Sequence, residues 1–300
     1  MGGLGEFALI RRILSRLGTP AAADVLGPGD DAAVVPTPDG RVVATIDVLV
    51  EGRHFTREWL TAYDIGRRAA AASMADVAAM GARPTALVVG LTMPSASDLD
   101  WLDGLADGFR DEAAVCHAHV VGGDLVRSDL LTVAVTALGD LGGCAPVTRA
   151  GARIGDVVAV AGRLGWSAAG LRALQSGVTA GPLPDAFRRP EPPYDVGPQV
   201  AVCGATAMID VSDGLAADLG HIATASGVRI DVDLDALRGL GTDGVGDDDL
   251  LTGGEDHALA FTIAADVDLS DVCTTIGRVR AGTGVHAEGR PIFGGHDHFA

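Results

Sequence analysis

The chain has 300 residues, of which 48% are hydrophobic, and its formal net charge at pH 7 is −18. A chain of this length exceeds what one core usually supports, so we expect a globular protein with one large or two ordinary domains. The negative charge argues against nucleic acid and anionic membranes as partners, because phosphate surfaces attract basic proteins. No apolar stretch reaches the roughly 18 residues of a membrane-spanning helix, so we expect no membrane segment.

The cysteines and the N-terminus favour a cytoplasmic protein. Cys116, Cys144, Cys203 and Cys273 form no Cys-x-x-Cys pair and have no zinc-ligand spacing, so we expect buried free thiols in a reducing compartment. Residues 1–6 have neither the basic region nor the apolar run of a signal peptide.

In the first half of the chain, helical and strand patterns alternate. Phe7, Ile10, Leu14 and Leu17 recur at helical spacing and predict an amphipathic helix over residues 6–17. The further elements expected are strands at 41–49, 85–93, 119–122 and 130–138 and helices at 64–80 and 98–116. Such an alternation is typical of an α/β or α+β fold.

A stretch rich in Gly, Pro and Arg at 140–155 predicts a domain boundary, which gives domains 1–145 and 146–300. The second half repeats the alternation, with strands expected at 156–161, 206–210, 228–233, 258–263 and 275–280 and helices at 167–175 and 215–225. The proline-rich residues 181–198 are interpreted as a surface excursion, and the Gly/Asp-rich residues 238–249 as a mobile loop.

The basic residues are unusual in kind. All 22 are arginine, and the chain contains neither lysine nor asparagine. This composition excludes a P-loop, the strand lysine and catalytic-loop asparagine of protein kinases, and Schiff-base chemistry through lysine. Another cation must therefore take the role of lysine at any phosphate site of this chain.

Five short acidic motifs stand in glycine-rich or small-residue settings: 29–31, 45–47, 122–124, 210–214 and 253–256. Asp47 lies inside an apolar strand and Asp210 ends one, positions at which a carboxylate is rare unless it is paired or metal-bound. Gly122 and Gly123 are expected to end a strand and to let the backbone approach a ligand. Clustered carboxylates repel one another, and Mg²⁺ removes that conflict, so the motifs together predict a phosphate site with several Mg²⁺ ions.

Each motif alone has a plainer interpretation. Asp30 fits a solvated turn, Asp76 a solvent-facing helix position, and Ser212 a helix N-cap. Among the histidines of the first half, His54 is the best candidate for a general base. A phosphate ester as acceptor needs no base, because its second pKa of about 6 leaves it ionised at neutral pH.

These motifs resemble the thiamine-monophosphate kinases, of the superfamily that includes aminoimidazole ribonucleotide synthetase. Two strings are the most specific, residues 51–55 (Glu-Gly-Arg-His-Phe) and residues 210–215 (Asp-Val-Ser-Asp-Gly-Leu). The resemblance extends nearly from end to end through residues 5–7, 29–33, 45–47, 76–82, 122–124, 149–152 and 253–256.

The resemblance implies ATP-dependent phosphorylation of thiamine monophosphate by in-line transfer. It implies a two-domain α/β (α+β) fold in which the N-terminal domains of a homodimer pair into a β-barrel. The implied metal ligands are Asp30, Thr45, Ile46 through its carbonyl, Asp47, Asp76, Asp124, Asp210 and Asp213, of which Asp47, Asp124 and Asp210 are expected to be catalytic. The implied ATP-binding residues are Asp30, Gly123, Asp124, Arg149 and Ser212, and the substrate-binding residues are His54, Glu255 and His296.

The chain departs from the family pattern at four positions. Ile46 replaces a Thr or Ser, His257 and His296 replace aromatic residues, and Ala106 stands near the place of a tyrosine that packs on the nucleotide. Two alternatives to the kinase follow. One is another ATP-using enzyme of the superfamily, such as a carbamoyl-dehydrating maturation factor or a selenophosphate synthetase. The other is a non-catalytic nucleotide- or thiamine-binding protein.

Overall fold

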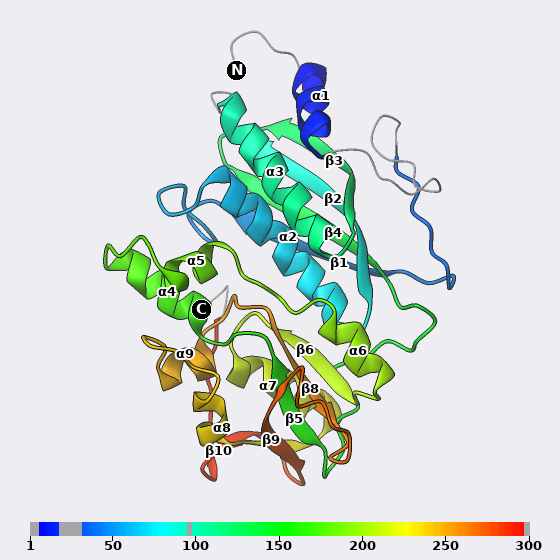
Figure 1. The fold of residues 1–300 in the computed structure, drawn as a ribbon, viewed down its shortest axis with the longest axis vertical. Coiled ribbons are helices and arrows are strands. Elements are labelled where there is room, and N and C mark those ends of the chain that lie inside the picture. Colours follow the sequence, from blue (N-terminus) through cyan, green and yellow to red (C-terminus); the bar gives the residue numbers. More distant parts are fainter. Residues whose placement is uncertain (1–5, 18–31, 95–97, 297–300) are drawn as a thin grey trace. The chain divides into compact units, whose positions relative to one another are not determined.

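The computed structural model describes residues 6–17, 32–94 and 98–296. The chain divides into two compact units (Figure 1). The N-terminal unit extends to Val77 and resumes over Arg83–Gly142, and the C-terminal unit comprises Ala78–Ala82 and the chain from Gly143 onward. No helix in the described part of the chain is long and apolar enough to cross a membrane.

The N-terminal unit is a four-stranded sheet with helices on one side (Figure 1). The strand order is β1-β4-β2-β3, in which β2 and β3 run parallel and the other neighbours antiparallel. The strands are β1 Val43–Val50, β2 Arg83–Met93, β3 His119–Arg127 and β4 Thr132–Asp140, and the helices are α1 Glu6–Leu17, α2 Ala62–Ala79 and α3 Leu99–Val115.

The two faces of this sheet differ in burial. Along β4, residues 133, 135 and 137 are fully buried, and the residues between them are only half-buried. Along the edge strand β1, Ile46 and Val48 are 61% and 47% exposed. Strand residues alternate between faces, so one face packs under the helices and the other carries exposed apolar side chains.

Helices α2 and α3 cross at two glycines. A Cβ added at Gly66 would lie 2.4 Å from the carbonyl oxygen of Leu105, and one at Gly108 would lie 2.2 Å from that of Tyr63. Real Cβ atoms do not approach an oxygen so closely, so only glycine permits these two backbones to touch.

The C-terminal unit is a seven-stranded mixed sheet in the order β11-β10-β7-β9-β5-β8-β6. Its core is formed by apolar residues of the strands and of α7, which contributes Leu215, Leu219 and Ile222 among others. The strands are β5 Val157–Ala161, β6 Ala207–Val211, β7 Arg229–Val232, β8 Ala258–Ile263, β9 Thr274–Arg280, β10 Gly284–Ala287 and β11 Arg290–Pro291. The helices are α4 Trp166–Gln175, α5 Pro182–Arg188, α6 Val196–Val202, α7 Leu215–Ser226, α8 Leu234–Arg238 and α9 Asp247–Thr252.

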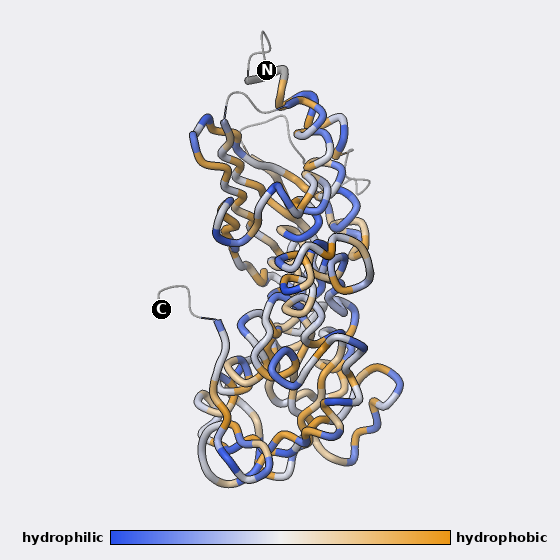
Figure 2. Tube along the Cα trace, turned by 90° about the vertical axis from the view of Figure 1, so that its left-hand side faces the viewer, coloured by the Kyte–Doolittle hydropathy of each residue, from blue (hydrophilic) through white to orange (hydrophobic). Residues whose placement is uncertain are grey.

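Most expected elements form within a few residues of their predicted ends. Residues 98–116 become α3 with Asp98 as N-cap, since its side chain accepts the N–H of Asp100. In Figure 2, hydrophilic residues gather at turns and hydrophobic residues along the strands. This distribution is the pattern from which the elements were predicted.

Two expectations about local structure are wrong, and a third holds in part. Residues 181–198 are not a surface excursion: they hold α5, whose first turn accommodates prolines, and the start of α6, and Phe187 and Tyr194 are buried there. The expected loop at 238–249 is present over residues 239–246, but α9 begins at Asp247, and Asp249 is buried and bonded to Arg172. The four cysteines are free, but three are half-buried and Cys203 is exposed, so they are not core thiols.

We predict that Gly108→Ala lowers the free energy of unfolding by about 1–3 kcal/mol, because the new methyl group must push α2 from α3. Gly104→Ala in the same helix is the matched control, since its Cβ would meet Ala62 at an ordinary 3.4 Å. Alanine is the better helix former by up to about 1 kcal/mol, so this control should be neutral or stabilising. Urea unfolding measures the free energy of unfolding of both variants. Equal effects of Gly108→Ala and Gly104→Ala would contradict the requirement for glycine where α2 and α3 cross.

Candidate functional site

Three of the expected metal ligands meet between β1 and α2. Thr45 and Asp47 are two residues apart on β1 and therefore share one face, toward α2. The hydroxyl of Thr45 donates to Oδ2 of Asp76 at 2.6 Å, and the hydroxyl of Ser73 donates to Oδ2 of Asp47 at 2.8 Å. Asp76 is thus half-buried, with its carboxylate directed to β1.

Ser73 is a neighbour of this group that the sequence patterns did not single out. It lies three residues before Asp76 and is fully buried. Residues three apart share one face of a helix, so a hydroxyl at this position of an alanine-rich helix was the available signal. Ile46 points its side chain to the opposite face of β1, so only its backbone is available on the side of Asp47.

Gly123 and Asp124 lie inside β3, because the strand continues to Arg127. The expectation that they end a strand is wrong. A Cβ at Gly123 would lie 2.3 Å from the carbonyl oxygen of Val89, so the close approach at this glycine is to the neighbouring strand. Asp124 is exposed, and its carboxylate accepts the N–H of Leu125 at 3.0 Å.

An apolar cavity of about 110 Å³ adjoins these two residues. Its walls come from α1, α3, β2 and β3 and include Leu14, Ala106 and Phe109, with Gly123 and Asp124 also lining it. The alanine at position 106 leaves space where the family resemblance would place a tyrosine. The cavity therefore joins an apolar wall to a carboxylate within one unit.

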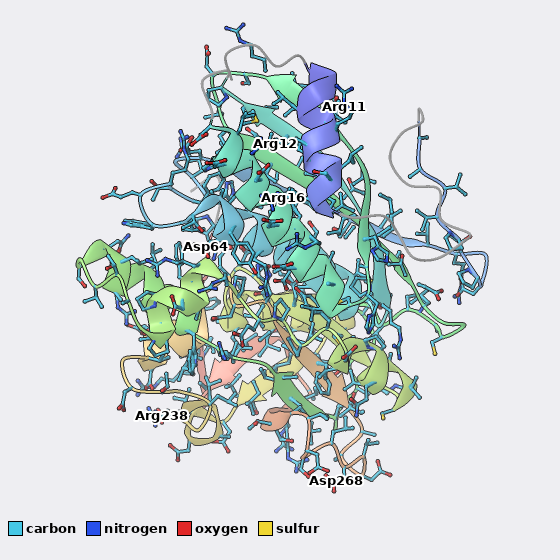
Figure 3. The ribbon with its side chains drawn as sticks, turned by 45° about the horizontal axis from the view of Figure 1, so that its top comes forward. Arg11, Arg12, Arg16, Asp64, Arg238 and Asp268 are labelled. Atoms are coloured by element: carbon cyan, nitrogen blue, oxygen red, sulfur yellow. The ribbon has the colours of Figure 1, made fainter. Side chains whose placement is uncertain are left out.

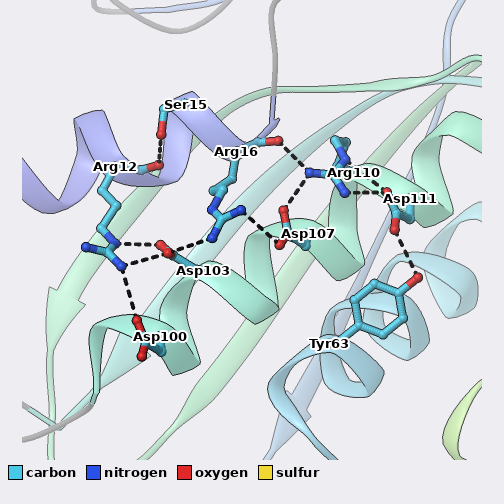
Figure 4. A network of polar contacts seen from close by, with 9 residues as sticks. All are labelled: Arg12, Ser15, Arg16, Tyr63, Asp100, Asp103, Asp107, Arg110 and Asp111. Carbon is cyan, nitrogen blue, oxygen red and sulfur yellow. Dashed lines mark hydrogen bonds and ion pairs between the residues drawn. The ribbon is translucent and has the colours of Figure 1, made fainter.

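Helix α1 is held over this cavity by ion pairs to α3 (Figures 3 and 4). Arg12 donates to both oxygens of Asp103 at 2.6 and 2.7 Å, and Arg16 donates to the same carboxylate at 2.9 Å. Arg110 donates to the backbone carbonyl of Arg16 at 3.1 Å and to Asp107. The hydrogen bond from Arg12 lowers the pKa of the Asp103 carboxyl, against the opposing effect of its burial.

His54 is fixed by its own loop. The N–H of Val50 donates to Nδ1 of His54 at 3.0 Å, and the backbone N–H of His54 donates to the carbonyl of Val50. Phe55 anchors the loop, being 4% exposed. An Nδ1 that accepts a hydrogen bond places the ring proton on Nε2, so the loop selects the tautomer of His54.

In the C-terminal unit, backbone hydrogen bonds bring three segments together. The loop after β6 accepts a hydrogen bond from the segment before β8: the N–H of Glu255 donates to the backbone carbonyl of Ser212 at 2.8 Å. The same loop accepts from the C-terminal segment, since His296 N–H donates to the carbonyl of Asp213 at 2.9 Å. The predicted residues Ser212, Asp213, Glu255 and His296 therefore do meet. Glu255 has a φ of 67°, in the left-handed region that is uncommon for residues other than glycine.

Beneath this junction lies a group of buried acids. Asp210 is 4% exposed, and Asp218 is 2% exposed and accepts the N–H groups of Asp213 and Gly214 at 3.1 Å each. Burial, followed by the charges of Asp210 and Asp213, raises the pKa of Asp218 to about 7. A further acid, Asp256, accepts the N–H groups of Gly165 and Ser167 and thus caps the start of α4.

Two predicted residues are not brought into these groups. Arg149 lies at an exposed bend, and its carbonyl accepts from Ser226 Oγ at 3.1 Å. Asp30 lies outside the described residues, as do Asp31 and the chain end from residue 297.

The oxygen donors fit magnesium, although within the described residues no three acidic, histidine or cysteine side chains form a ready metal cage. Mg²⁺ takes carboxylate oxygens and is bound through one or two of them together with substrate phosphates. Half-buried Asp47 and Asp76 and the acids around Asp210 have this character. The donor set therefore suits Mg²⁺ that arrives with a phosphate ligand.

Comparison with known families gives two matches. Residues 29–141 match the AIR synthase related protein, N-terminal domain, and residues 153–286 match the corresponding C-terminal domain. The chain is similar to the thiamine-monophosphate kinase of Mycobacterium tuberculosis (strain ATCC 25618 / H37Rv), with 48% identity over 93% of this chain and 86% of the relative. It is 35% identical to that of Escherichia coli (strain K12), over 99% of this chain and 98% of the relative.

Solved structures agree with these matches. The thiamine-monophosphate kinase of Stenotrophomonas maltophilia K279a superposes with a TM-score of 0.84 at 38% identity, covering 96% of this chain and 98% of that one. AaThiL complexed with AMPPCP and TMP superposes with a TM-score of 0.79 at 30% identity, covering 100% and 98%. Escherichia coli HypE, at 19% identity, a TM-score of 0.76 and 98% coverage of both chains, shares the fold.

We predict that Asp103→Asn lowers the melting temperature by about 2–4 °C at pH 7 and low salt, the shift expected for a loss of about 1 kcal/mol. A carboxyl with a lowered folded-state pKa stabilises the protein above its unfolded pKa near 4 and ceases to do so as the pH falls through the folded value. The difference from wild type should therefore vanish in acid, and it should shrink in 1 M salt. Asp100→Asn, at a side chain 89% exposed, is the control that should change little.

Proposed function

The chain belongs to the thiamine-monophosphate kinase family, and from that membership we propose that it phosphorylates thiamine monophosphate to thiamine diphosphate with ATP, by direct in-line transfer. The observation that carries this conclusion is the 48% sequence identity, over 93% of this chain, to the thiamine-monophosphate kinase of Mycobacterium tuberculosis. The absence of lysine agrees with it, because a phosphoryl transfer that relies on magnesium needs no lysine.

The metal-binding residues are proposed separately for each unit. In the N-terminal unit they are Thr45, Asp47, Asp76, Asp124 and the carbonyl of Ile46, together with Asp30. In the C-terminal unit they are Asp210 and Asp213. Mg²⁺ bound by such residues would neutralise charge on the transferring phosphoryl group. Asp47, Asp124 and Asp210 are the catalytic residues in this proposal, because each is a carboxylate carried by a strand, Asp47 by β1, Asp124 by β3 and Asp210 by β6.

The remaining contacts are assigned to ATP and to the acceptor. Asp30, Gly123, Asp124, Arg149 and Ser212 are proposed to bind ATP, and His54, Glu255 and His296 to bind thiamine monophosphate. The apolar cavity beside Gly123 suits the purine ring, because it offers a flat ring apolar walls next to a carboxylate that can share a metal with the phosphates. Helix α1, which ion pairs hold against α3, forms one wall of that cavity with Ile10, Ile13 and Leu14.

We predict that Asp124→Asn lowers turnover by roughly a hundredfold, the scale of losing one electrostatic stabiliser of a transition state. Asp124 is exposed and stabilises no core, so the variant should keep the melting temperature of the wild type. Asp129→Asn, at a nearby exposed aspartate, is the matched control and should keep normal turnover. Near-normal turnover of Asp124→Asn would remove Asp124 from the site.

The experiment that tests the function compares acceptors. ADP release is measured with thiamine monophosphate and with free thiamine between pH 5 and 8. We expect turnover with the monophosphate alone, falling below about pH 6 as its phosphate takes up a proton, also in His54→Gln. Equal turnover of free thiamine would contradict the proposal and return His54 to the role of general base. No turnover with either acceptor would favour another ATP-using enzyme of the superfamily or a non-catalytic binding protein.

We further propose a homodimer formed by the N-terminal domain, with residues 1–145 serving metal binding, ATP binding and dimerisation and residues 146–300 forming the C-terminal α/β domain. The support is the exposed apolar face of the first sheet, on which Ile46 and Val48 lie at an edge strand. Pairing of two such faces into a barrel would bury this apolar surface and the open strand edge.

We predict that Val48→Asp converts the dimer to a monomer at micromolar concentration, because a carboxylate buried in an apolar interface loses its hydration. Val202→Asp is the matched control. Val202 is 74% exposed and lies in the C-terminal unit, so the Val202→Asp variant should remain a dimer. Light scattering measures the oligomeric state of both variants. A wild-type monomer, or a Val48→Asp dimer of unchanged affinity, would refute this interface.

A further inference from the structure

We propose that Ser73 and His257 are positioning residues, each of which holds Oδ2 of one magnesium-binding aspartate, Asp47 for Ser73 and Asp210 for His257. The inference rests on the proposed function, since that function makes these aspartates metal ligands. Neither donor belongs to the motifs that assign the site. Each acts through its aspartate and touches no substrate.

Ser73 is fully buried where its hydroxyl meets the half-buried Asp47. Its side chain is 0% exposed, and its Oγ lies 2.8 Å from Oδ2 of Asp47 and 3.0 Å from the carbonyl oxygen of Val135. A hydroxyl has one proton and donates to one of these acceptors at a time, and the bond to the charged carboxylate is the stronger. The carbonyl of Val135, on the neighbouring strand, limits the directions in which the hydroxyl can turn.

His257 meets Asp210 in the same way in the other unit. Nδ1 of His257 lies 3.1 Å from Oδ2 of Asp210, and both side chains are 5% exposed. The backbone N–H of His257 donates to Val211 at 3.0 Å, which ties the residue to the strand that carries Asp210. A carboxylate oxygen accepts, so Nδ1 donates in this pair.

A hydrogen bond to one oxygen of a carboxylate restricts the plane in which the group presents its oxygens to a metal. Without the donor, the side chain would have to be ordered when the metal binds, and part of the binding free energy would be spent on that ordering. Partners of metal ligands typically change metal affinity by about 10- to 100-fold when they are removed. The arrangement here is of that kind, with a buried donor on an aspartate in each unit.

The first test is Ser73→Ala, followed by Mn²⁺ binding to the full-length protein in the presence of AMPPCP, read by electron paramagnetic resonance. We expect the Kd for Mn²⁺ to rise by about 10- to 100-fold. Ser167→Ala is the matched control, because Ser167 is 1% exposed and its hydroxyl has no hydrogen-bond partner among the described residues. Melting temperatures in EDTA separate a loss of metal affinity from a loss of folding.

The second test uses two variants of His257, whose φ of 54° is tolerated better by asparagine than by most residues other than glycine. His257→Asn keeps a donor near the place of Nδ1, and His257→Leu removes it. We expect Asn to retain Mn²⁺ affinity and Leu to lose about tenfold or more. His286→Leu is the control, since Nδ1 of His286 is buried without a partner in the described structure and its loss should leave Mn²⁺ binding unchanged.

Wild-type Mn²⁺ affinity in both Ser73→Ala and His257→Leu would overturn the inference. Equal losses of Mn²⁺ affinity in Ser73→Ala and Ser167→Ala would also overturn it. Should His257→Leu fail to fold, Ser73→Ala still decides the role of Ser73, and a loss of Mn²⁺ affinity in His257→Asn would contradict the role of His257. The binding measurement needs no turnover, so a protein that binds Mn²⁺ with the nucleotide analogue but forms no thiamine diphosphate would refute the proposed function and leave this inference to its own result.

Discussion

Mutual repulsion of carboxylates is the constraint on which this structure depends. The chain carries 40 acidic and 22 basic residues, and several of its acids are placed where water is scarce. Around Asp210 the effect is plain, because the pKa of Asp218 rises to about 7 through burial and the neighbouring negative charges. Such a group is stable only when the repulsion is relieved by hydrogen-bond donors or by cations.

Several of the acids assigned to the site accept hydrogen bonds from uncharged donors. Arginines pair with structural carboxylates, as Arg12 and Arg16 do with Asp103 to hold α1 against α3. At the site, Asp76 and Asp47 accept from the hydroxyls of Thr45 and Ser73, and Asp124 accepts a backbone N–H. A hydroxyl or a backbone N–H brings no full charge, so a hydrogen bond from it does not neutralise the carboxylate that a divalent cation requires.

Backbone contacts set the scaffold for these acids. Gly108 lets α3 touch α2, which carries Asp76, and Gly123 lets β3 pack against β2 beside the apolar cavity. In the C-terminal unit, a Cβ at Gly254 would lie 2.1 Å from the carbonyl of Ser212, so glycine is required for the junction that brings Glu255 to this loop. The glycines beside the acidic motifs therefore serve close contacts within the protein.

The sequence by itself determined the fold class, most elements and the family, because apolar periodicity and short motifs are local properties of the chain. It also placed Asp47 and Asp210 correctly as acids on apolar strands. Only the tertiary structure decided that Ser73 faces Asp47 and His257 faces Asp210, since these pairs join residues 26 and 47 positions apart. The same holds for Gly123, whose neighbour Val89 lies on another strand. Contacts between distant residues depend on strand register and helix crossing, and these are set by packing over the whole unit, which no local pattern records.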